Sequence, residues 1–174
     1  MENISKRTIS LTITAMMFAL IMVFSVLEST LTPLLGLPPG IRLGLTNIVV
    51  MYSLFFMNKP TAFMLVILKS AFVLTTRGGI AGFLSLSGGV LAFAVMVLLI
   101  IIFKDNISIL ILSIAGAIAH NIGQLMIASL LLHQNLILVY LPVLLVSGVI
   151  VGSITGSLLR ITLPLLRKIA INRE

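Results

Sequence analysis

The sequence predicts an all-α polytopic membrane protein, a six-transmembrane-helix bundle that forms a single domain over residues 1–174. Three observations lead to this fold class. The composition is 60% hydrophobic and only 9% charged, whereas charged residues make up roughly a quarter of a soluble domain. Long apolar runs alternate with short polar or Gly/Pro-rich breaks, and most basic residues gather at alternate breaks. The bilayer is therefore expected to be the main solvent of this chain.

Six apolar runs qualify as membrane helices, since crossing a hydrocarbon core of about 30 Å takes roughly 20 apolar residues, and fewer where the ends are buried in protein. Prolines and glycines break the chain at 33–40, and Pro60 is well placed to open the third helix. Short polar turns at 104–106 and 133–135 separate the last three helices. The expected helices cover residues 8–28, 41–57, 61–76, 82–103, 107–132 and 136–163.

The segment 77–89 is the hardest part to place, because it carries five glycines among apolar residues. Glycine weakens a helix, whereas the apolar residues disfavour full exposure. We therefore expect a loop or broken helix that dips into the protein. Such a segment is compatible with a moving gate.

The basic residues predict the orientation, because short cytoplasmic loops are enriched in Lys and Arg. One side of the predicted topology collects Lys6, Arg7, Lys59, Lys104, Arg167, Lys168 and Arg173. The other side holds Arg42 and Arg77. Both termini are therefore expected to be cytoplasmic in a multi-pass protein of the cell membrane. The formal charge of +7 comes from these short clusters, so we expect no nucleic-acid partner.

Acidic and thiol chemistry is scarce. The chain has four acids, Glu2, Glu28, Asp105 and Glu174, and no cysteine. His120 has no other histidine, cysteine or carboxylate at metal-ligand spacing, so we expect no metal and no cofactor. An enzyme acting on lipid would need the polar residues around His120 to do acid or base work without a nearby carboxylate. We therefore expect that the chain is not an enzyme.

Lys69 falls in the middle of the third predicted helix. A charge near the bilayer centre costs about 2.5 to 3.5 kcal/mol on the lenient insertion scale, so such residues usually face a cavity or a partner. The alternative is a side chain that reaches along the helix to the interface. We favour a role in a cavity or binding site.

Arg42 and Arg77 lie at the non-cytoplasmic ends of the second and third predicted helices, beside Pro-rich or Gly-rich segments. The arginine fork suits a carboxylate or phosphate ligand, and it suits lipid headgroups equally well. Anion recognition and interfacial anchoring both remain open for them. Glu28, at the outer end of the first helix, is expected to pair with Arg42.

Polar residues also mark one face of the fifth predicted helix. His120 and Gln124 are one turn apart, and Asn121 is adjacent to both. Asn47, with Thr46, forms a similar polar position on the second helix. For each of these residues, hydrogen bonding between helices and contact with a ligand both remain open.

Two faces of small residues allow close helix approach. Ala15 and Ala19 form an Ala-xxx-Ala face on the first helix, and Gly148, Gly152 and Gly156 form a longer one on the last. Such faces are common in membrane bundles, and their partners can be internal.

Taken together, these residues resemble a known family. The blocks that carry the likeness are 42–50 (Arg-Leu-Gly-Leu-Thr-Asn-Ile-Val-Val), the Lys69 helix, the Arg77-Gly78-Gly79 segment with Gly88-Gly89, and 116–124 (Gly-Ala-Ile-Ala-His-Asn-Ile-Gly-Gln). They resemble the Gx transporter family, also labelled heptaprenyl diphosphate synthase component I. The likeness covers nearly the whole chain.

This family is similar to the substrate-binding S components of energy-coupling factor (ECF) transporters, which are six-helix proteins with an outward ligand pocket. The resemblance implies that Ala15 and Ala19 dock onto a transmembrane coupling subunit. The sequence lacks a phosphate-binding Gly-x-x-x-x-Gly-Lys-Ser/Thr loop, so separate ATPase subunits would hydrolyse ATP. The synthase label fits the residues poorly, since diphosphate chemistry needs clustered oxygen ligands for magnesium and the chain has one aspartate.

Our leading hypothesis is a membrane substrate-binding or transport subunit for a small anionic molecule. Its expected binding residues are Arg42, Asn47, Lys69, Arg77, His120, Asn121 and Gln124. The rival is a non-catalytic accessory membrane subunit linked to isoprenoid or quinone metabolism or to a membrane electron-transfer assembly. In that case the polar residues would only join helices.

Overall fold

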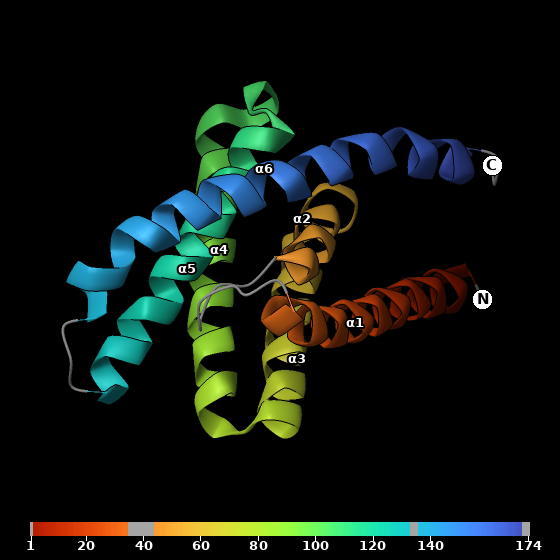
Figure 1. Cartoon of the computed structure of the whole chain (residues 1–174). Helices are drawn as coiled ribbons and strands as arrows, with labels where there is room; N and C mark the ends of the chain where they lie inside the picture. The colour runs from red at the N-terminus through yellow and green to blue at the C-terminus, as the bar shows by residue number, and fades with distance from the viewer. Residues whose placement is uncertain (1, 35–43, 133–135, 172–174) are drawn as a thin grey trace.

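The computed structural model confirms an all-α bundle and describes residues 2–34, 44–132 and 136–171 (Figure 1). Side chains are described between residues 8 and 161, apart from 32–33, 105, 132 and 136–139. Arg42 and the turn 133–135 lie outside the described residues. The elements are α1 (Glu2–Leu34), α2 (Leu45–Phe56), α3 (Lys59–Arg77), α4 (Gly79–Phe103), the short 3₁₀ turn η1 (Lys104–Asn106), α5 (Ile109–Leu132) and α6 (Leu136–Ile171).

The helices pack mainly against their neighbours in sequence. α4 lies between α3 and α5, and α5 lies between α4 and α6. α2 contacts every other long helix, whereas α1, within the described residues, contacts only α2 and α3. In Figure 1 the N-terminal part of α1 extends beyond the helices that it touches. Most of the core therefore lies among α2 to α6, and α1 is attached at one side, where Ile21 packs against Val49 and Leu65.

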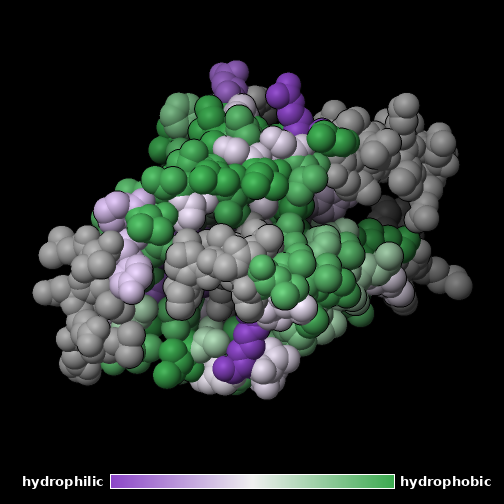
Figure 2. All heavy atoms as spheres, viewed as in Figure 1, coloured by the Kyte–Doolittle hydropathy of each residue, from purple (hydrophilic) through white to green (hydrophobic). Residues whose placement is uncertain are grey.

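Five of the six helices are long and apolar enough to cross a membrane. α2 is the exception, because its 12 residues span only about 18 Å at 1.5 Å per residue. Our expected second helix, 41–57, begins too early, because α2 starts at Leu45 and Gly44 before it has a left-handed backbone with φ of 74°. Figure 2 shows an apolar surface across the middle of the molecule, with the most hydrophilic side chains near the upper and lower edges of the view.

The start of α3 follows the prediction. Pro60 lies in its first turn, and the Asn58 side chain accepts a hydrogen bond from the Thr61 amide at 2.9 Å. An N-cap of this kind satisfies one of the amide groups that have no partner at a helix start. The turn between α2 and α3 is therefore fixed by local chemistry.

The prediction of a loop or broken helix at 77–89 is wrong. The chain turns at Gly78 alone, with φ of 89°, and α4 is helical from Gly79 onward. Glycine costs about 1 kcal/mol relative to alanine inside a helix, but here it lets neighbouring helices approach. A Cβ atom on Gly82 would lie 2.5 Å from Leu74 Cβ, and one on Gly89 would lie 2.7 Å from Val66 Cγ1. Close packing against α3 offsets the weak helix propensity.

Candidate functional site

Lys69 lies inside the bundle. Its side chain is 3% exposed, and its Nζ donates a hydrogen bond to Asn47 Oδ1 on α2 at 3.2 Å. This position argues against a side chain that reaches along lipid to the interface. α2 and α3 therefore hold one cation and one amide together in the interior of the protein.

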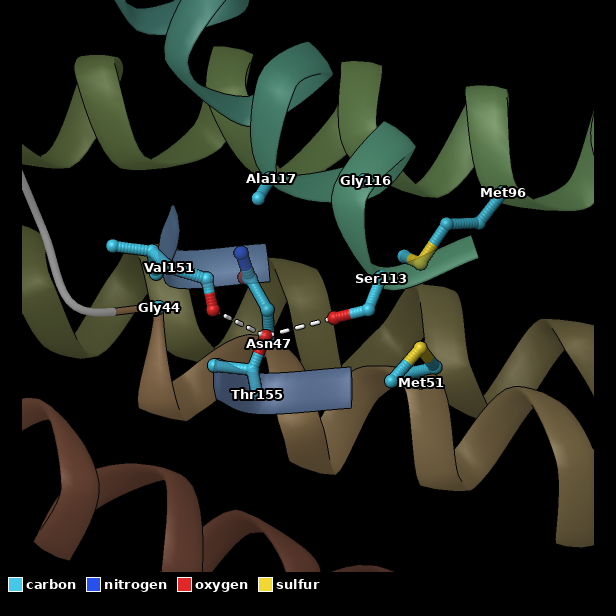
Figure 3. A pocket seen from close by; sticks show the side chains of 9 residues that line it. All are labelled: Gly44, Asn47, Met51, Met96, Ser113, Gly116, Ala117, Val151 and Thr155. Atoms are coloured by element: carbon cyan, nitrogen blue, oxygen red, sulfur yellow. Dashed lines mark hydrogen bonds between the residues drawn. The ribbon is translucent and has the colours of Figure 1, made fainter. Parts of the chain in front are cut away.

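Asn47 also lines a cavity between α2, α4, α5 and α6 (Figure 3). The cavity has a volume of about 10 Å³, which is near the lower limit for one water molecule. Its lining residues are Gly44, Asn47, Met51, Met96, Ser113, Gly116, Ala117, Val151 and Thr155. The Lys69–Asn47 pair therefore adjoins this cavity through Asn47.

Two hydroxyl groups complete the polar part of this cavity. Ser113 Oγ on α5 and Thr155 Oγ1 on α6 are 2.8 Å apart, and the Thr155 hydroxyl is also 3.0 Å from the Val151 carbonyl oxygen. Both side chains are buried. They join α5 to α6 while presenting oxygen atoms to the cavity.

His120 and Gln124 face α4. Both are buried, at 3% and 5% exposure, and both pack against Gly88. A Cβ atom on Gly88 would be 2.8 Å from His120 Nδ1 and 2.8 Å from Gln124 Cγ. This close crossing is supported by Ser87 Oγ, which donates to the Gly123 carbonyl at 3.0 Å.

The helix register places these polar residues at a similar depth. Val66 lies opposite Gly89 and Leu74 opposite Gly82, so α3 and α4 are antiparallel and Lys69 falls near the level of the residues between Ser85 and Gly88. Since Gly88 in turn contacts His120 and Gln124, α5 contributes to the same layer. Among the described residues, Ser85 Oγ and Gln124 Nε2 are buried there without a hydrogen-bond partner.

Asn121 faces a different helix. Its Nδ2 donates to the Leu144 carbonyl of α6 at 3.0 Å and is 3.5 Å from Ser147 Oγ. These contacts match the hydrogen-bonding alternative for this residue. Its predicted contact with a ligand stays a prediction.

Arg77 lies about 12 Å further along α3 than Lys69. Its guanidinium donates to the backbone carbonyl of Ser25 on α1 and is 3.4 Å from Ser25 Oγ. One turn along α1, Glu28 is 3% exposed and its Oε1 accepts from the Leu45 amide at 2.6 Å. A carboxylate at a helix N-terminus is favourable, so Glu28 caps α2. The predicted Glu28–Arg42 pair involves a residue outside the described ranges.

Ala15 and Ala19 are exposed. The buried face of α1 carries Ile21, Ser25 and Glu28, and Ile21 is roughly 200° around the helix from Ala19. The alanine face therefore points away from the other described helices.

Several cavity residues were not predicted from the sequence. Met51 and Met96 are core residues by type, and Thr155 lies among the small residues of α6. Ser85, which lies in the layer around Lys69 and does not line the cavity, could have been recognised as a buried residue. It precedes Gly88 and Gly89 by three and four residues and so shares their helix face. No group of three or more His, Cys, Asp or Glu that could hold a metal occurs within the described part of the chain.

Comparison with known proteins gives one family. The family described as heptaprenyl diphosphate synthase component I matches residues 17–162, which includes the layer around Lys69 and most of each long helix. No curated protein and no solved structure matches the chain. The chain therefore belongs to the heptaprenyl diphosphate synthase component I family.

Proposed function

We propose that this protein is a membrane substrate-binding subunit that holds a small anionic molecule inside its bundle, in the manner of an ECF transporter S component. The observation that carries the proposal is the buried Lys69 cation, bonded to Asn47 beside the cavity. Lysine is seldom buried in a membrane helix without a functional reason. Asn47 connects this charge to a space lined by helices from distant parts of the sequence.

The second support is the number of polar groups at this depth. Lys69, Gln124 and Ser85 are each at most 5% exposed, although the surrounding helices are strongly apolar. Buried groups without hydrogen bonds cost about 1–3 kcal/mol each, so Ser85 and Gln124 favour a function over simple packing. A ligand could supply their missing bonds.

A partner surface on α1 is part of the proposal. Ala15 and Ala19 lie on the exposed side of a helix that touches only α2 and α3 among the described elements. Small residues allow close approach of another transmembrane helix. We assign this face to a transmembrane coupling subunit, with separate ATPase subunits behind it, in a cell membrane with both termini cytoplasmic.

The chain itself is proposed to be non-catalytic. Its single aspartate, Asp105, gives no pair of acidic motifs for holding a magnesium diphosphate. Binding without bond cleavage is the chemistry that amide, hydroxyl and ammonium groups support best.

The family description favours a second candidate, a non-catalytic accessory membrane subunit for prenyl diphosphate synthesis or a related quinone or electron-transfer assembly. Under this alternative the alanine face would dock a different protein. Coupling and ATPase subunits that copurify with the chain would favour the first candidate, and enzymes of isoprenoid or redox metabolism would favour the second.

Native mass spectrometry of protein gently extracted from its own host membrane tests the binding proposal. Lys69→Gln removes the buried charge, and Lys59→Gln is the matched control because Lys59 is exposed at the start of the same helix. We expect a small-molecule mass on the wild type and on the control, and its loss from Lys69→Gln. Equal retention in both variants, or no bound mass in any of them, would contradict the proposal.

A further inference from the structure

The lining of the cavity indicates what kind of anion it takes. Its polar groups, Asn47, Ser113 and Thr155, meet on one side of the space, and the side chains of Met51 and Met96 lie together beside them (Figure 3). The two methionines are each 2% exposed and belong to the same core cluster. The cavity is therefore divided into a polar part and an apolar part.

The apolar part is closed by adaptable side chains. Methionine has an unbranched, flexible chain that can repack around different shapes. Met96 lies directly over Gly116, where a Cβ atom would come within 3.0 Å of Met96 Sδ. A larger residue at 116 would push Met96 away. The position of the Met96 side chain against Gly116 therefore helps to limit the cavity to its present volume of about 10 Å³.

Lys69 is the described cation beside the polar part of the cavity, although it does not itself line the space. Lys69 reaches the cavity through Asn47, to which it donates at 3.2 Å. Arg77 is about 12 Å away along α3 and is bonded to Ser25 of α1. One charged group therefore lies, through Asn47, beside a small cavity that Met51 and Met96 line with apolar side chains.

We infer that the cavity accepts an amphiphilic anion, with its charged group at Lys69 and Asn47 and its apolar body in place of the Met51 and Met96 side chains. This inference rests on the proposed function and narrows the substrate to anions that carry an apolar body. Displacement of the two methionine side chains would enlarge the present volume of about 10 Å³, and their unbranched, flexible chains allow such repacking. Inorganic anions such as phosphate match the charge but have no apolar body to take the place of the methionine side chains.

The natural chain has no cysteine, so a single introduced thiol reports on the cavity. Ala117→Cys places a thiol in the lining, and Ser113→Cys does so at a second position with nearly the same side-chain volume. The rate of modification by N-ethylmaleimide is measured in proteoliposomes with three probes: naphthalene-2-sulfonate, inorganic phosphate, and a naphthylmethyl trimethylammonium ion.

We expect naphthalene-2-sulfonate to slow modification about tenfold or more, the change that corresponds to about 1.4 kcal/mol. Phosphate and the cationic naphthalene should have little effect. Adding Lys69→Gln should abolish the protection, and adding Lys59→Gln should preserve it. Equal protection by both naphthalene ions, equal protection by phosphate, no protection, or folded variants whose thiols never react would each overturn the inference. A bound small molecule in native mass spectra alongside any of these results would leave the proposed function standing and this inference refuted.

Discussion

Two helices carry faces of small residues, and the structure uses them differently. On α6, Gly148 and Gly152 pack against the backbone of α5, where a Cβ atom on Gly152 would lie 2.5 Å from Ile114 Cα. On α1, Ala15 and Ala19 are exposed. The same sequence pattern therefore marks an internal helix crossing in one place and an open face in the other. Spacing shows that a helix can be approached closely, and only the fold shows whether the chain itself provides the approaching helix.

The largest expected effect comes from filling the α6 face. Gly152→Leu forces side-chain atoms into the α5 backbone, and overpacking of this kind costs about 1–3 kcal/mol or occasionally more. The free energy of unfolding, measured by denaturant titration in mixed micelles, should fall by about 3 kcal/mol. An unchanged value would show that α5 and α6 are not in tight contact.

A smaller loss of stability is expected at Asn121, which joins α5 to α6. Asn121→Leu removes its hydrogen bond to the Leu144 carbonyl, and interhelical bonds in membranes contribute about 0.6–2 kcal/mol. The same titration should show a decrease of about 1 kcal/mol, with retention of the bound small molecule unchanged. Loss of that molecule in native mass spectra would instead assign Asn121 to the ligand.

Gln124 is the matched residue one turn away, facing α4. Its Nε2 has no hydrogen-bond partner among the described residues, so Gln124→Leu should leave the free energy of unfolding within about 0.5 kcal/mol of the wild type. In the wild type, a ligand would be the only hydrogen-bond partner of this amide group. Retention of the bound small molecule in native mass spectra should therefore decrease when Gln124 is replaced by leucine. A large loss of stability would show that the amide already joins the helices.

The smallest expected effect on stability is at the α1 face. Ala19→Leu enlarges an exposed position, and such changes usually alter the free energy of unfolding by no more than about 0.5 kcal/mol. Recovery of partner subunits in a pull-down should nevertheless fall sharply. Leu20→Ala is the control, because Leu20 is also exposed on α1 but lies off the alanine face. Equal losses of partner from both variants would mean that α1 has no specific docking side.

Much of the fold could be predicted from the sequence, because long apolar runs and polar turns are local signals. The six helices, their order and the start of α3 beside Pro60 followed from such signals. The short α2 and the helical glycine segment did not. Whether glycines bend or continue a helix depends on what packs against them, and the contacts of Gly82 and Gly89 with α3 are tertiary information.

The candidate site was predictable only as a set of residue types. Polar residues in apolar helices identified Asn47, Lys69, His120 and Gln124, and the structure places them at a shared depth. Their partners could not be predicted, since Lys69 and Asn47 are 22 residues apart and meet only because α2 packs on α3. Arg77 similarly donates a hydrogen bond to Ser25, 52 residues away in the sequence. No local sequence pattern identifies Met51 and Met96 as residues that line the cavity.

In our proposal, the interior around Lys69 holds the ligand while the outer face of α1 holds the partner. Native mass spectrometry of wild type, Lys69→Gln and Ala19→Leu, each extracted from the host membrane, tests it in one measurement. We expect Lys69→Gln to lose the small-molecule mass and keep the partner subunits, and Ala19→Leu to lose the partners and keep the small molecule. If one variant loses both, or if neither loses anything, the two regions do not have these separate roles.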